Sequence, residues 1–142
     1  MIEEIMNKRP LTDKQKAVLR GLGVQAVYLF GSRALGKEGP LSDYDYGVLL
    51  SRPGHHRGDP IYDRLYDLFA EISPRTLAND VIDIVFLRDI GLELRFHVVR
   101  YGVVIFETDS GARVNFESDT VLLYSDFRPL LDRFDEAIME SL

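Results

Sequence analysis

The pattern of hydrophobic and polar positions predicts strands that alternate with helices along the chain. Four apolar runs have the length and the β-branched or aromatic content of strands, and they span residues 24–30, 47–50, 81–87 and 103–106. Apolar residues at helical spacing predict helices over 61–72 and 92–101. This alternation is typical of an α/β domain, which we expect to hold a mixed β-sheet of about four strands flanked by helices.

The two ends of the chain carry further helix signals. Thr12 and Gln15 form a capping-box pattern ahead of a short apolar stretch, and this predicts a helix before the first strand. After Asp109 or Ser110, apolar positions from 114 to 138 suit one long helix, or two helices that break near Pro129. The fold prediction therefore ends in a C-terminal helical region.

Composition narrows the class of protein. The 142 residues are 46% hydrophobic and 28% charged, which are values of a globular chain, so we expect residues 1–142 to form a single domain. A formal net charge of -6 disfavours direct nucleic-acid binding, because such binding depends on attraction to phosphates. No apolar run approaches the length of a membrane span, the N-terminal residues lack the apolar core of a signal peptide, and there is no cysteine. We expect a soluble, cytoplasmic protein with no membrane partner.

Three aspartates are the strongest candidates for chemistry. Asp43 and Asp45 stand two residues apart where the second strand begins, so both side chains should project from one face. Asp83 interrupts an apolar strand, where an unpaired carboxylate costs several kcal/mol. If these strands are neighbours, the three carboxylates converge on an oxygen-rich site that suits Mg²⁺ or Mn²⁺, and two such ions clamp a phosphoryl transfer. Considered alone, each aspartate is by default a turn or cap residue.

A glycine and a serine follow the first strand directly. Gly31 lets the backbone approach a phosphate, and Ser32 adds a hydroxyl where the free N–H groups of a short helix would favour an anion. A plain strand-to-helix turn is the alternative. The run from Gly31 to Lys37 also matches the GxxxxGK part of a Walker A loop, but Glu38 stands where that loop needs a Ser or Thr. We therefore do not assign a Walker A loop.

Together these residues give the pattern Gly31-Ser32, ten residues, then Asp43-x-Asp45, with Asp83 on a later strand. The pattern resembles the DNA polymerase β-like nucleotidyltransferase superfamily, and in particular the minimal nucleotidyltransferase (MNT) antitoxins that are paired with HEPN-domain toxins. The resemblance covers nearly the whole chain, through VYLFGSRA, PLSDYDYGVLL and DIVFL to a closing helical region.

The resemblance implies a role for each matching residue. Asp43 and Asp45 would bind two Mg²⁺ ions, and Asp83 would share a metal and accept the proton of the acceptor hydroxyl. Gly31 and Ser32 would hold the phosphates of ATP. Many relatives have an arginine just before the second glycine of this loop, where this chain has Leu35, and Arg33 is the other source of that charge.

Three functions follow from the resemblance. In the first, the protein is an Mg²⁺-dependent nucleotidyltransferase and antitoxin that transfers AMP from ATP to a tyrosine of its HEPN RNase toxin, within a hetero-oligomer. In the second, it neutralises the toxin by forming a stable complex, with little or no catalysis. In the third, the acceptor is a small molecule, as for aminoglycoside nucleotidyltransferases, although 142 residues leave little room for the extra substrate-binding structure of those enzymes.

Other polar and aromatic residues have simpler interpretations. His55 and His56 stand in a Gly/Pro-rich loop and are expected to be solvated, and His97 is expected to pack on a helix. Tyr44 and Tyr46 alternate with the aspartates and should face away from them into the core, with base stacking as the alternative. Surface positions in contact with solvent are the default for a set of arginines that could otherwise contact phosphate or a partner: Arg75, Arg88, Arg95 and Arg100.

Overall fold

The computed structural model describes residues 11–31, 44–73 and 82–141. In these residues four strands form one mixed sheet in the order β3-β2-β1-β4. The strands are β1 (Val24–Phe30), β2 (Tyr44–Leu50), β3 (Ile82–Phe86) and β4 (Val103–Glu107). β1 pairs antiparallel with β2 and with β4, whereas β2 pairs parallel with β3. The predicted α/β fold with a four-stranded mixed sheet is confirmed.

The described helices are α2 (Asp13–Gly21), α3 (Pro60–Ile72), α4 (Leu92–Tyr101) and α5 (Ser110–Ser141). The capping box of α2 is formed as predicted: the Gln15 N–H donates to the Thr12 hydroxyl at 3.1 Å, and the Thr12 N–H donates to the Gln15 side chain at 2.9 Å. The Asp109 carboxylate accepts from the Ala112 N–H at 2.9 Å and so caps α5. α5 continues through Pro129 as a single helix, which settles the choice between one helix and two.

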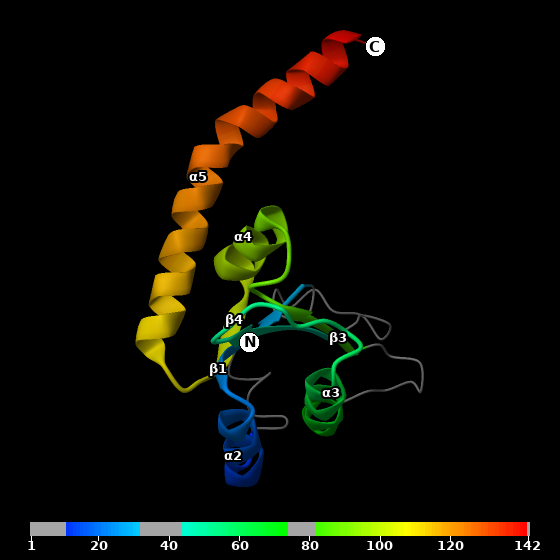
Figure 1. The fold of residues 1–142 in the computed structure, drawn as a ribbon, viewed down its shortest axis with the longest axis vertical. Coiled ribbons are helices and arrows are strands. Elements are labelled where there is room, and N and C mark those ends of the chain that lie inside the picture. The colour runs from blue at the N-terminus through cyan, green and yellow to red at the C-terminus, as the bar shows by residue number, and fades with distance from the viewer. Residues whose placement is uncertain (1–10, 32–43, 74–81, 142) are drawn as a thin grey trace.

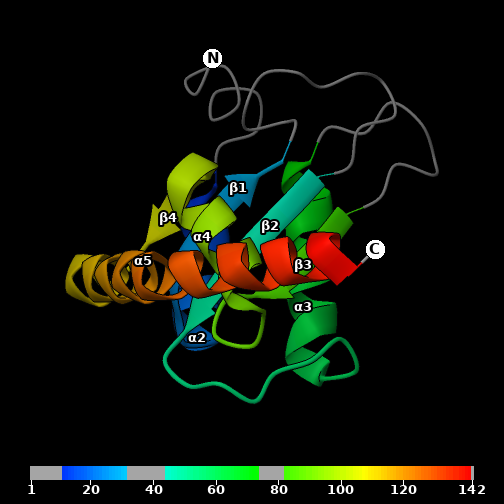
Figure 2. The ribbon, with the colours of Figure 1, turned by 90° about the horizontal axis from the view of Figure 1, so that it is seen from above.

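The sheet separates two hydrophobic cores. On one face, β-strand side chains pack against α2 and α3, with Leu19, Leu65 and Phe69 fully buried. On the other face, Tyr28, Leu49 and Leu87 pack against Val98 of α4 and Phe116 of α5. Figure 1 shows this arrangement, with α2 and α3 on one side of the sheet and α4 and α5 on the other. In Figure 2 the strands lie in the order β4, β1, β2, β3, and α5 crosses in front of them.

A small polar network fixes the start of α5 to the sheet. The buried Tyr28 hydroxyl donates to the Glu117 carboxylate at 2.6 Å. Arg113 donates to the same carboxylate at 3.0 Å and also forms an ion pair with Glu107 of β4. The two carboxylates raise the pKa of Arg113, since each favours the charged guanidinium. None of the described helices is both long and apolar enough to cross a membrane.

Candidate active site

The ends of three strands meet at one edge of the sheet. Because β1 is antiparallel to β2 and β2 is parallel to β3, the last residue of β1 lies beside the first residues of β2 and β3. The register pairs Asp45 with Phe30 on one side and with Asp83 on the other. The structure thus brings together two of the three predicted carboxylates, from residues that are far apart in the sequence.

Both carboxylates face the side of the sheet that carries α4 and α5. Their neighbours along the strands, Tyr46 and Ile84, belong to the opposite core, and side chains alternate between faces. Asp45 and Asp83 are each half-buried. Two carboxylates in register and facing the same side, with only part of their surface in water, are a donor set that suits a hard divalent cation.

Gly31 closes this site from the end of β1. Its φ of +77° lies in the left-handed region, which side-chain-bearing residues rarely adopt. A Cβ atom at this position would also collide with the carboxylate of Asp45. The backbone of Gly31 therefore lies directly against Asp45, and a side chain at this position would have to displace that carboxylate. This contact places the start of the predicted phosphate-binding segment next to the acidic pair.

The remaining predicted site residues lie outside the described residues: Asp43, Ser32 and Arg33. Within the described part of the chain, no three acidic or histidine side chains gather closely enough to hold a metal ion. Asp45 and Asp83 are the described members of the predicted acidic triad.

The tyrosines that alternate with the aspartates are core residues, as predicted. Tyr46 stacks on Phe69 of α3 with ring centroids 4.2 Å apart, and its hydroxyl shares a 2.6 Å hydrogen bond with Ser73. Tyr44 is buried in the same core. Both point away from the carboxylates, so neither takes the alternative role of a base-stacking residue on the face of Asp45.

His97 of α4 lies closer to the candidate site than its sequence context suggests. Its ring is edge-on to Phe30 at 6.4 Å and lies 5.2 Å from the ring of Tyr101. Since Phe30 is the cross-strand neighbour of Asp45, the rings of Phe30 and His97 line the α4 side of the site. The predicted packing role of His97 is correct. Only the strand register shows that its partner, Phe30, is the neighbour of Asp45. The four-residue spacing from His97 to Tyr101 was the available signal.

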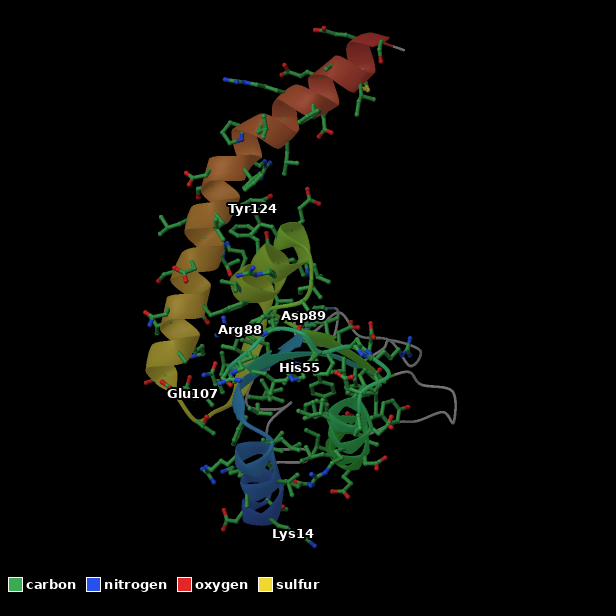
Figure 3. The ribbon with its side chains drawn as sticks, viewed as in Figure 1. Lys14, His55, Arg88, Asp89, Glu107 and Tyr124 are labelled. Atoms are coloured by element: carbon green, nitrogen blue, oxygen red, sulfur yellow. The ribbon has the colours of Figure 1, made fainter. Side chains whose placement is uncertain are left out.

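The loop after β2 lies at the opposite end of that strand. The Asp89 carboxylate accepts hydrogen bonds from the backbone N–H groups of Gly54 and His55, at 2.7 and 3.2 Å (Figure 3). The His56 side chain is exposed, as predicted, and contacts Asp59 at 2.9 Å. The ring of His55 instead packs on Phe86, with 5.5 Å between ring centroids, so the expected solvation of this residue is wrong.

Two of the arginines assigned to solvated surface positions hold the fold together. Arg88 donates to the Leu50 carbonyl at 2.6 Å and lies over the ring of Phe116. Arg95 lies over the same ring at 4.8 Å and donates to Thr120 at 3.2 Å. Desolvation, together with the nearby charge of Arg88, lowers the pKa of Arg95. The surface assignment was wrong for both residues, because Phe116 arrives from a helix that follows them in the chain.

Comparison with known proteins identifies the family to which this chain belongs. A family model described as "Polymerase beta, Nucleotidyltransferase" matches residues 13–111. This range holds the four strands of the described residues, together with Asp45 and Asp83. No curated protein sequence matches the chain.

Solved structures share the fold at low sequence identity. One, a toxin–antitoxin with AMP-PNP, is 23% identical with a TM-score of 0.64, and the match covers 90% of this chain and 99% of that one. Another, a tri-AMPylated Shewanella oneidensis HEPN toxin in complex with MNT antitoxin, is 22% identical with a TM-score of 0.62 and coverage of 98% and 99%. These similarities extend along almost the whole chain.

Proposed function

The chain belongs to the polymerase beta nucleotidyltransferase family, and on this premise we propose that it is an Mg²⁺-dependent enzyme that transfers AMP from ATP to a protein hydroxyl. The observation that carries the proposal is the register that sets Asp45 beside Asp83, with the backbone of Gly31 against Asp45. We further propose that Asp43 completes the acidic triad and that Ser32 and Arg33 contact the nucleotide phosphates. Residues 1–142 would act as a single catalytic domain.

The proposed reaction is a displacement at the α-phosphorus of ATP. The acceptor oxygen forms a bond to that phosphorus, the bond to the oxygen bridging to the β-phosphate breaks, and pyrophosphate leaves. Asp83 would accept the proton of the acceptor hydroxyl, while Asp43 and Asp45 would bind the Mg²⁺ ions. The bound Mg²⁺ ions supply charge stabilisation for the attacking and leaving oxygens. The contribution of the chain is therefore mainly positioning, which the rigid pairing of β2 with β3 provides.

The acceptor is proposed to be a tyrosine of a cognate HEPN RNase toxin, so that the protein acts as a cytoplasmic antitoxin. Support comes from solved structures of similar fold, which include a toxin–antitoxin with AMP-PNP and a tri-AMPylated HEPN toxin in complex with an MNT antitoxin. In this proposal ATP is the nucleotide substrate, and the toxin is both the acceptor and the partner in a hetero-oligomer.

A small-molecule acceptor is less well supported. A groove of about 390 Å³ lies between α2 and α3, and its lining includes Thr12, Arg64 and Glu71. This groove is on the face of the sheet opposite to Asp45 and Asp83, because α2 and α3 pack in the other core. A molecule bound there would not meet the proposed catalytic carboxylates.

The test is a transfer assay with purified protein, the cognate toxin, Mg²⁺ and labelled ATP. We expect Asp45→Asn and Asp83→Asn each to lower the transfer rate on the order of a hundredfold or more, as for loss of a group that stabilises transition-state charge. Asp63→Asn is the matched control, since Asp63 is an exposed carboxylate on α3. Transfer by Asp45→Asn at the wild-type rate would refute the proposal.

A further inference from the structure

Helix α5 extends well beyond the body of the protein. Its first turns are fixed by Phe116 and Thr120, which are 3% and 0% exposed. Tyr124 then stacks on Phe96 of α4, with ring centroids 3.9 Å apart and an interplanar angle of 5°. Figure 3 shows Tyr124 directed from α5 towards α4, and Figure 1 shows that the helix continues past α4 with no other helix or strand of the described residues beside it. We call residues 125–141 the distal part of α5.

The apolar face of the helix does not end where its packing ends. Large apolar side chains continue at intervals of three or four residues and remain exposed by 43–61%: Leu123, Phe127, Leu130, Phe134 and Ile138. This spacing extends the row that begins with Phe116 and Thr120, so all of these residues lie on one helix face. We call the exposed members the distal stripe. A narrow stripe of about two residues in every seven is typical of the seam along which one helix packs against another.

Pro129 shapes this surface. At 100° per residue it lies about 100–160° around the helix from Phe127, Leu130 and Phe134, and so outside the distal stripe. A proline inside a helix bends it, because the ring clashes with the preceding turn. The distal stripe is therefore on the concave side, and Figure 1 shows the helix curving towards the side on which α4 lies. A groove that binds the distal stripe would therefore have to follow the same bend.

The charges of the distal part indicate the kind of partner. This segment contains five acidic residues and two basic ones: Asp126, Asp132, Asp135, Glu136 and Glu140, with Arg128 and Arg133. A second copy of the helix would bring two acidic surfaces together, and an anionic membrane would repel the same charges. A partner with basic residues around an apolar groove has the complementary charge.

We propose that the distal stripe of α5 docks in an apolar groove of an α-helical protein whose rim carries Lys and Arg residues. The inference rests on the proposed function in one respect, since it identifies this partner with the toxin that accepts AMP. The distal stripe would hold the acceptor by binding contacts that are separate from the ATP site. It is a tether for the acceptor protein and not part of the catalytic machinery.

The experiment compares two double variants that add the same charge. Phe127→Glu with Phe134→Glu changes the distal stripe, whereas Leu122→Glu with Met139→Glu changes exposed residues outside it, which are 64% and 71% exposed. Affinity is measured by calorimetry with the cognate toxin in an RNase-inactive form. We expect the stripe variant to bind at least a hundredfold more weakly and the control variant to bind within threefold of wild type. Circular dichroism should show both variants folded, because all four side chains are exposed.

The other outcomes are distinct. Wild-type affinity of the stripe variant would overturn the proposal. If light scattering shows that the wild-type chain is a dimer and the stripe variant a monomer, the stripe binds a second copy of the chain and the proposal is overturned. If the wild-type chain binds anionic vesicles and the stripe variant does not, the stripe binds a membrane and the proposal is likewise overturned.

Transfer is measured separately, at saturating toxin concentration. There the stripe variant should still transfer AMP, whereas Asp45→Asn should bind the toxin without transferring. A failure of the docking proposal therefore differs from a failure of the proposed function.

Discussion

At the scale of single residues, Gly31 is the point where backbone geometry and the acidic site depend on each other. Its φ of +77° and the contact of its backbone with the Asp45 carboxylate impose two separate demands. Gly23 meets only the first, since its φ is +80° and nothing lies within 4 Å of an added Cβ. Substituting each glycine by alanine therefore distinguishes the effect of backbone strain, which both variants have, from displacement of the Asp45 carboxylate, which only the Gly31 variant has.

We predict that Gly31→Ala lowers the rate of AMP transfer about a hundredfold, since a catalytic group displaced by roughly 1 Å loses that much. Gly23→Ala should lower the free energy of unfolding by about 1–2 kcal/mol through the same unfavourable φ, and leave transfer unchanged. Steady-state transfer rates and urea titrations measure the two effects. Equal transfer rates for both variants would show that the Gly31 contact with Asp45 does not matter for activity.

Tyr28 gives a second prediction at this scale. Burial, together with the hydrogen bond to Glu117 and the charge of that carboxylate, raises the pKa of the Tyr28 phenol above its ordinary value of 10.0. The unfolded chain then loses this proton at lower pH than the folded chain does. Stability contributed by Tyr28 is complete below about pH 10 and falls as the pH rises above it, by about 1.4 kcal/mol per pH unit.

Tyr28→Phe should therefore remove part of the alkaline loss of stability. At pH 7 it should also lower the free energy of unfolding by about 1.5–3 kcal/mol, because the hydrogen bond to a charged group is lost. Urea titrations from pH 8 to 11 measure both effects. Tyr101→Phe, at a 48% exposed position, is the control and should keep the alkaline loss. A Tyr28→Phe profile parallel to wild type would contradict this account.

The candidate carboxylates could be selected from residue types. Asp45 and Asp83 stand out because one carboxylate lies at the start of a strand and the other interrupts the apolar run of a second strand, where burying it costs free energy. The contact between Gly31 and Asp45 was not predictable, since it depends on strand register, which is set by pairing across the sheet. The role of His97 beside Phe30 was hidden for the same reason.

At the scale of elements, α5 depends on one buried side chain. Phe116 is 3% exposed and lies beneath the guanidinium groups of Arg88 and Arg95. Thr120 accepts a hydrogen bond from Arg95 and donates to the Phe116 carbonyl at 2.8 Å. These contacts join α4, α5 and the strand ends, so removing the ring affects all three.

We predict that Phe116→Ala lowers the free energy of unfolding by about 3–5 kcal/mol, the range for removing a buried aromatic ring. Leu122→Ala, on the same helix at a 64% exposed position, should change it by less than about 0.5 kcal/mol. Thermal unfolding followed by circular dichroism compares the two. Equal effects would mean that α5 is not held to the body by Phe116.

Local signals predicted where the elements begin, but not how they meet. The capping box of Thr12 and Gln15 and the Asp109 cap are formed by residues close in sequence, and both were visible in it. Whether α5 would pass through Pro129 depends on whether the helix as a whole tolerates one lost hydrogen bond and a bend, which a pattern of residues does not contain. The contacts of Arg88 and Arg95 with Phe116 join residues from different elements, so they could not be predicted from the sequence either.

At the scale of the whole molecule, the sheet order β3-β2-β1-β4 is what turns separate carboxylates into a site. Alternation of strands and helices predicted the fold class, but the order of strands required the structure. In the same topology α5 leaves the sheet on the face that carries Asp45 and Asp83, so the proposed active site and the distal stripe lie on the same side of the sheet. A protein acceptor bound to the distal stripe would lie on the side of the sheet that the carboxylates face.

The central claim is that this edge of the sheet transfers AMP to a protein, and the intact mass of the cognate toxin tests it most directly. We predict that toxin co-expressed with the wild-type chain carries one or more added AMP groups on tyrosine. Toxin co-expressed with Asp45→Asn should carry none, and toxin co-expressed with Asp63→Asn should match wild type. An unmodified toxin beside the wild-type chain, or a modified one beside Asp45→Asn, would contradict the account.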